Sequence, residues 1–93
     1  MVRTKVYIAG PIREVPDYKE RFAEMRKRYE EHGLAVLDPS TLPEGMEQSD
    51  YMRICMAMIQ SADFIHMLPG WENSEGATIE KAYADMIGLS VHY

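Results

Sequence analysis

Four short apolar segments alternate along this chain with three longer segments of helical periodicity, and this alternation constrains the fold more than any other feature. The expected strands are Lys5–Ala9, 34–37, 63–68 and 89–93. Each of the first three is followed within two residues by a proline, which cannot donate to a sheet ladder. Apolar residues recur at every third or fourth position between them, which predicts helices from Tyr18 to about Gly33, at 50–61 and at 77–87.

This order of elements predicts a parallel sheet. Strands that alternate with helices form parallel strand–helix–strand units, and right-handed crossovers place helices on both faces of the sheet. We therefore expect an α/β protein, a three-layer sandwich with a doubly wound parallel sheet of about four strands, flavodoxin- or Rossmann-like. With 93 residues the chain is expected to form a single domain, residues 1–93.

The ends and faces of the helices can also be predicted. Asp17 and Ser49 are good N-caps for the first and second helices, and Gly33 can end the first in a left-handed conformation. The second helix is apolar on most sides and is expected to be largely buried. The third helix is expected to bury a stripe of four apolar residues, Ile79, Tyr83, Met86 and Ile87.

Composition excludes several classes of function. The net charge is -5 and the charges are interspersed, which argues against nucleic-acid binding but not against a small anionic ligand. Cys55 is the single cysteine, so we expect no disulfide, and the three histidines lack the spacing of a metal site. No segment reaches the ~20 apolar residues of a membrane span or resembles a signal peptide. We expect a soluble, cytoplasmic protein.

The chemistry is expected at one edge of the sheet. In open parallel sheets, ligands bind outside the carboxyl ends of the strands, where the strand order reverses. The loops 10–16, 38–48 and 69–76 leave those ends and lead into helix N-termini, which attract anions. Glu80 follows the third loop by one helical turn, where a half-buried carboxylate could serve as nucleophile or electrostatic stabiliser. The alternative is an ordinary exposed helix glutamate.

Several motifs resemble those of the nucleoside 2-deoxyribosyltransferase superfamily. They run over nearly the whole chain and comprise 6–12 (VYIAGPI), 61–63 (SAD), 67–71 (MLPGW) and the pattern Ser74-x-Gly76-Ala77-x-x-Glu80. The resemblance implies that Glu80 attacks the anomeric carbon of a (deoxy)nucleoside, in the manner of a retaining glycosidase. It implies that Tyr7 lies beside that nucleophile and the sugar. No cofactor is implied.

The resemblance also suggests where a substrate binds. Ser74 stands where the transferases usually carry aspartate and where the 2′-deoxynucleoside 5′-phosphate N-hydrolases carry serine, beside a phosphate. Arg13 belongs to a turn that resembles the phosphate-binding turn of those hydrolases, so the expected substrate contacts are Gly10, Pro11, Ile12, Arg13, Trp71, Ser74 and Gly76. The plain alternatives are an N-cap for Ser74, a solvated charge for Arg13, and packing against a partner subunit for Trp71.

Cys55 departs from the superfamily pattern. It occupies the position of an aspartate that acts on the leaving base. A thiol in an apolar helix is a poor acid, and a buried small hydrophobe is the simpler interpretation.

Three functions therefore remain open. The first is an N-glycosidase or deoxyribosyltransferase that acts on nucleosides or their 5′-monophosphates, expected as a homodimer. The second is a catalytically weak or inactive nucleotide-binding module. The third is a partner-binding protein without a small ligand, which an exposed, unpaired Glu80 far from any pocket would favour.

Overall fold

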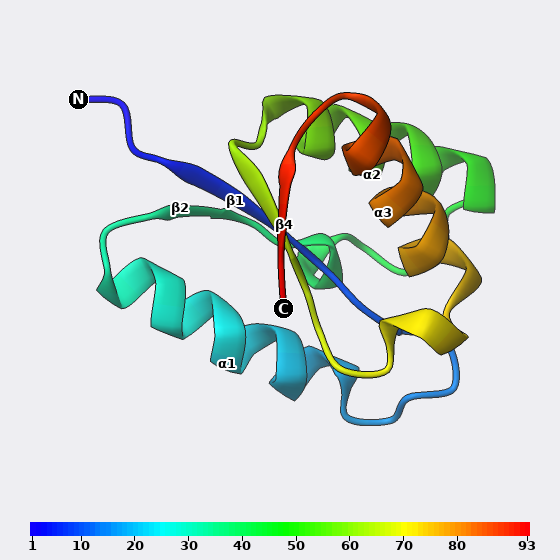
Figure 1. Ribbon diagram of the computed structural model, residues 1–93. Coiled ribbons are helices and arrows are strands. Elements are labelled where there is room, and N and C mark those ends of the chain that lie inside the picture. The colour runs from blue at the N-terminus through cyan, green and yellow to red at the C-terminus, as the bar shows by residue number, and fades with distance from the viewer.

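The computed structural model describes residues 1–93 and contains a four-stranded parallel sheet between two helical layers. In order across the sheet, the strands are β2 (Ala35–Leu37), β1 (Lys5–Ala9), β3 (Phe64–Met67) and β4 (Ser90–His92). Helix α1 (Tyr18–Glu31) covers one face, and α2 (Gln48–Ser61) and α3 (Glu75–Met86) cover the other (Figure 1). The predicted α/β sandwich is confirmed. None of the helices combines the length with the apolar character that a membrane-spanning segment requires.

The central strand β1 divides the core between the two faces. Successive side chains of a strand point to opposite faces, so neighbouring residues of β1 enter different clusters. Tyr7 and Ala9 lie in the larger cluster under α2 and α3, whereas Ile8 packs with Phe22 and Leu68 under α1. Strand β1 pairs with β2 on one side and β3 on the other, so the strand order reverses between β1 and β3.

Two of the three predicted helix signals are corrected. Asp17 stands at the N-cap position of α1 but makes no capping bond, because its carboxylate pairs with Arg21 at 3.1 Å. Helix α2 begins at Gln48, so Ser49 is not its cap. Asp50 instead accepts a hydrogen bond of 3.1 Å from the backbone N–H of Glu47, which places the helix start one turn before that carboxylate. Gly33 ends α1 with φ of 83°, as predicted.

The predicted burial of α2 and α3 is wrong in detail. Only Cys55 and Ile59 of α2 are buried, since the helix rests on the sheet along one stripe. The predicted stripe of α3 is largely exposed: Ile79 is 44%, Ile87 42% and Met86 81% exposed. The buried stripe of α3 is Ala77, Glu80 and Ala84.

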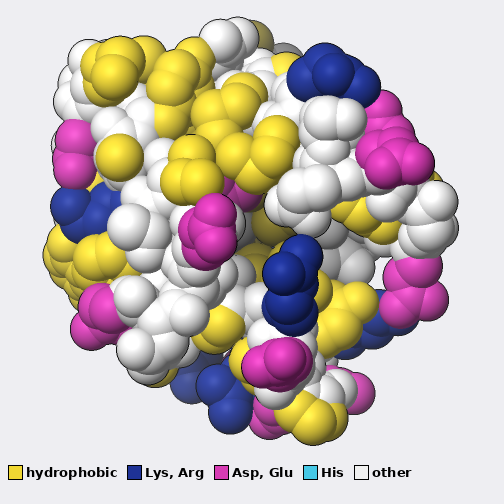
Figure 2. Space-filling view, turned by 90° about the vertical axis from the view of Figure 1, so that its right-hand side faces the viewer, with side chains coloured by type: hydrophobic (Ala, Val, Ile, Leu, Met, Phe, Trp, Pro, Cys, Tyr) yellow, Lys and Arg dark blue, Asp and Glu magenta, His cyan; other side chains and the backbone are white.

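This reversal has a steric cause. Two alanines let α3 approach the sheet closely, and the larger apolar side chains then turn outward. A hydrophobic patch covers the upper part of the face over α2 and α3 in Figure 2.

Candidate functional site

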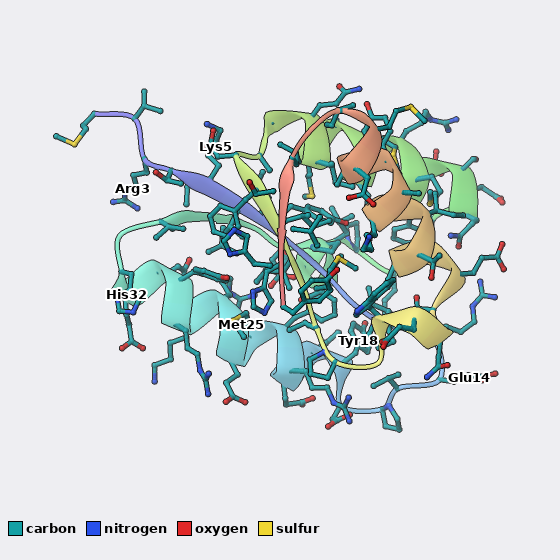
Figure 3. The ribbon with its side chains drawn as sticks, in the orientation of Figure 1. Arg3, Lys5, Glu14, Tyr18, Met25 and His32 are labelled. Carbon is teal, nitrogen blue, oxygen red and sulfur yellow. The ribbon has the colours of Figure 1, made fainter.

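A cavity of about 780 Å³ opens beside the loop that follows β1, at the reversal of strand order. Residues from all three predicted loops line it, together with the first turns of α2 and α3. Figure 2 shows the corresponding face hollowed near its centre, with one basic side chain beside the hollow and acidic side chains around it. Glu14 and Tyr18, which both line the cavity, lie at the opposite end of the molecule from Arg3, Lys5 and His32 (Figure 3). The cavity lies at the sheet edge where the sequence analysis expects a ligand.

Glu80 is buried in the wall of this cavity and bonded to Tyr7. Its side chain leaves the inner face of α3, and the residue is only 8% exposed. The hydroxyl of Tyr7, on β1, donates a hydrogen bond of 2.7 Å to Oε2 of Glu80. These two residues are 73 positions apart in the chain. No lysine or arginine forms an ion pair with Glu80, so a neutral donor is its strongest polar partner.

Burial governs the protonation of this pair. It raises the pKa of Glu80 from 4.5 to about 7, although the hydrogen bonds from Tyr7 and Cys55 act in the opposite direction. Burial also raises the pKa of Tyr7 well above its ordinary value of 10, and the charge of Glu80 adds to that effect. Tyr7 therefore remains a protonated donor at neutral pH, while Glu80 changes its charge near neutral pH instead of near 4.5. Such a carboxylate can act as a nucleophile in neutral or mildly basic solution.

Cys55 completes the buried polar group. It lies on α2, is 5% exposed, and shares the core cluster with Tyr7 while lining the cavity. Burial raises the pKa of its thiol to about 11, and the nearby charge of Glu80 adds to the shift. Cys55 therefore stays a neutral thiol over the physiological range and does not supply a proton as a carboxylic acid would.

The loop after β1 forms a second wall. A Cβ atom at Gly10 would lie 2.9 Å from Cβ of Leu68, so only glycine lets the loop pass this close to the end of β3. Pro11, Ile12 and Arg13 follow and all line the cavity. Arg13 is exposed and makes no ion pair, which leaves its guanidinium available to a ligand.

The N-terminus of α3 forms the third wall. The Oγ of Ser74 accepts a hydrogen bond of 3.2 Å from the backbone N–H of Ala77, so Ser74 is the N-cap of the helix. The same residue lines the cavity, as does Gly76, where an added Cβ would meet nothing within 4 Å. The capping role and a role in ligand binding are therefore compatible at Ser74.

One expected contact is not brought to the cavity, and two aromatic residues were missed. Trp71 does not line it, and its ring packs 6.2 Å from that of Tyr93 and 5.7 Å from Nζ of Lys81. Tyr18 and Tyr51 do line it. Tyr18 lies two residues after the loop 10–16, and its place at the sheet edge could have been predicted from the sequence. The hydroxyl of Tyr51 donates a hydrogen bond of 2.6 Å to the carbonyl of Pro43, and no sequence pattern predicts this contact.

The third open function is disfavoured by this geometry. Glu80 is neither exposed nor unpaired, and it lies in the wall of a cavity rather than far from one.

Seven chains of known structure resemble the protein in fold. A 2-desoxiribosyltransferase from Leishmania mexicana matches with a TM-score of 0.77 and 22% identity over 95% of this chain, and the match spans 61% of the transferase. The CMP N-glycosidase BcmB from Clostridium botulinum matches with a TM-score of 0.74 and 22% identity over 95% of this chain and 68% of the glycosidase. The superfamily resemblance is thus confirmed at the level of the fold.

Sequence comparison assigns the chain to a defined family. No curated protein resembles it in sequence at a significant level. A family model described as "Domain of unknown function (DUF4406)" matches residues 4–93. This match covers almost the whole chain, and the protein therefore belongs to the DUF4406 family.

Proposed function

We propose that the protein cleaves the N-glycosidic bond of (deoxy)nucleosides or their 5′-monophosphates, with Glu80 as the nucleophile. The observation that carries the proposal is the Tyr7–Glu80 pair, a buried carboxylate with a neutral donor in the wall of a cavity of about 780 Å³. A cavity of this size suits a ligand as large as a nucleotide. The named activities of the two structural neighbours, a deoxyribosyltransferase and a CMP N-glycosidase, agree with this chemistry.

The two residues of the pair would divide the work. Tyr7 holds Oε2 of Glu80, and the other carboxylate oxygen would face the substrate. That oxygen attacks the anomeric carbon, the base departs, and a glycosyl ester forms on Glu80. Water then hydrolyses the ester, or a second base replaces it in a transfer reaction. The proposal treats residues 1–93 as a single domain.

The 5′ end of the substrate is proposed to lie between Arg13 and the N-terminus of α3. Arg13 is the only basic residue that lines the cavity. Ser74 and Gly76 belong to the N-terminal turn of α3 and its cap, where backbone N–H groups and the helix dipole favour an anion. This arrangement favours 5′-monophosphates over free nucleosides.

A binding module without turnover is the second candidate. Cys55 favours it, because a thiol whose pKa is about 11 cannot protonate a departing base. Such a module would be stabilised by nucleotides in a thermal-shift measurement without releasing any base.

Chromatographic detection of free base separates the two candidates. The purified protein is incubated at pH 8 with deoxynucleoside and nucleoside 5′-monophosphates, beside the Glu80→Gln variant as the matched control. We expect release by the wild type and a loss of about a thousandfold or more in the variant, as for removal of a covalent nucleophile. Equal release by both proteins, or none by either with any substrate, would contradict the enzyme proposal.

We also propose that two copies of the chain associate through the apolar outer face of α3 and its C-terminal end. Ile79, Met86 and Ile87 are exposed there, and exposed apolar patches commonly mark protein interfaces. Sedimentation at micromolar concentration should give a dimer, and Ile79→Lys should shift it toward monomer. Lys27→Glu on exposed α1 is the matched surface control. A wild-type protein that is only monomeric would disprove this interface.

A further inference from the structure

Only one carboxylate lies deep in the cavity. Among the titratable residues of its wall, Cys55 and Glu80 alone are buried. Retaining glycosidases use a second carboxyl group as the acid that protonates the leaving group, and Glu80 already serves as nucleophile in the proposed function. The neighbouring Tyr7 donates its hydrogen bond to Glu80 and stays protonated, so it is no substitute for the missing acid. The departing base therefore has no buried acid beside it.

The rest of the wall is strongly acidic. Its charged side chains are Glu14, Glu44, Glu75 and Glu80 against the single basic residue Arg13. Glu44 lines the cavity from the loop before α2 and Tyr51 lines it from the first turn of that helix, whereas Arg13 belongs to the loop after β1. Acidic side chains attract a cation, and an aromatic ring such as that of Tyr51 adds to the attraction.

We propose that the natural substrates are N-glycosides whose base already carries a positive charge, such as a pyridinium or an N7-alkylpurinium mononucleotide. This inference rests on the proposed function of Glu80 and narrows it to a substrate class. A cationic base leaves as a neutral molecule and needs no proton from the protein. A substrate with a positively charged base is therefore compatible both with the absence of an acid at position 55 and with the acidic side chains of the cavity wall.

The reaction balances without any further reagent. An oxygen of ionised Glu80 bonds to the anomeric carbon as the glycosidic C–N bond breaks, and the electron pair of that bond neutralises the ring nitrogen. Water then replaces Glu80 on the anomeric carbon and loses one proton to solvent. One proton is therefore released for each cationic base, whereas hydrolysis of a neutral base releases none.

Matched substrate pairs test this inference on the wild-type protein. The first pair is 7-methylguanosine 5′-monophosphate and guanosine 5′-monophosphate, and the second is nicotinamide mononucleotide and its reduced, uncharged form. Free base and released protons are measured at pH 8 for the nicotinamide pair. The guanosine pair is measured at pH 6, because the 7-methylguanine ring loses its N1 proton, and with it its net positive charge, at about pH 7. The rate of Glu80→Gln is subtracted in both cases. We expect kcat/KM for the cationic member to exceed that for its neutral partner by about a hundredfold or more, the range that general acid catalysis supplies elsewhere.

A change at Cys55 adds a second readout. Cys55→Asp restores a carboxyl group and should reduce the cationic-to-neutral ratio at least tenfold, whereas Cys55→Ser should keep the wild-type ratio. Thermal unfolding checks that both variants fold. If Cys55→Asp does not fold, the comparison of cationic and neutral substrates on the wild-type protein tests the inference by itself.

The outcomes distinguish the two levels of the proposal. A Glu80-dependent ratio below a hundredfold would overturn the cationic-base inference and leave the glycosidase proposal standing. Absence of any Glu80-dependent cleavage, with cationic and neutral substrates alike, would overturn both.

Discussion

Two tyrosine pairs, one on each face of the sheet, have similar hydrogen-bond lengths and different consequences. Tyr7 bonds to Glu80 at 2.7 Å on the face covered by α2 and α3, and Tyr29 bonds to Nδ1 of His66 at 2.6 Å on the face covered by α1. Glu80 and His66 are both buried. Glu80 lines the large cavity, whereas His66 does not, so only the first pair can meet a ligand of this site.

The two pairs also differ in what burial does to charge. Desolvation raises the pKa of Glu80 to about 7. Desolvation also lowers the pKa of His66, and the charge of His92 is a second, smaller cause of that shift. Burial thus favours the neutral form of each residue. For His66 the neutral form is the one that packs at pH 7. For Glu80 the neutral form is the inactive form of the proposed nucleophile. The ionised form that catalysis would require therefore lowers the stability of the fold.

The largest effect expected from this difference is a pH-dependent stability that Glu80 alone causes. Its folded pKa of about 7 lies above the ordinary 4.5, so the folded protein holds the proton more tightly than the unfolded chain. The stabilisation is complete below about 4.5 and is lost as the pH rises to about 7, on the order of 3 kcal/mol in all. Urea unfolding at pH 5 and pH 8 should show this loss in the wild type and not in Glu80→Gln. An identical difference in both proteins would show that Glu80 is not the residue responsible.

A smaller effect should separate the two tyrosines. Tyr7→Phe removes the donor that favours ionised Glu80, so the pKa of Glu80 should rise further and kcat at pH 7 should fall about tenfold. The loss should shrink at higher pH, which a purely structural defect would not produce. Tyr29→Phe is the matched control on the opposite face. It should cost about 1 kcal/mol of stability and leave kcat unchanged, because its hydrogen bond lies outside the cavity. Equal activity losses would erase the distinction between the pairs.

The smallest expected effect comes from His66 and has the opposite sign. Its folded pKa lies below the ordinary 6.5, so the unfolded chain takes up a proton more readily. Its contribution to stability is present above pH 6.5 and is lost as the pH falls through the lowered folded pKa. Unfolding measured in the Glu80→Gln background, from pH 7 to pH 5, isolates this loss. His66→Gln in the same background should reduce it, and an unchanged slope would assign it to another group.

Much of the fold follows from local pattern. The central strand, Lys5–Ala9, was predicted to the residue, and the other strands and helices were predicted in the correct order. These features depend on residue periodicity and on prolines and glycines, which act over a few positions. The ligand edge follows as well, because a parallel sheet brings the carboxyl ends of its strands together.

The errors share a different cause. Ile79, Met86 and Ile87 are at helical spacing, but helix periodicity does not say which stripe of α3 meets the sheet. The close approach permitted by Ala77 and Ala84 decided it. Trp71 likewise lies in a loop at the correct edge, yet it packs beside Tyr93 near the C-terminus instead of at the cavity.

The sequence by itself determined the layered α/β fold and the edge at which the cavity forms, and it singled out Glu80 as the candidate carboxylate. Only the tertiary structure decided that Glu80 is buried and that Tyr7, 73 residues away, donates to it. It also decided that Cys55 lies buried with Tyr7 in the core beside the cavity, where its thiol is too weak an acid to serve as a proton donor. The physical reason is that the pKa of a side chain depends on its desolvation and on the neighbours that other strands and helices bring to it.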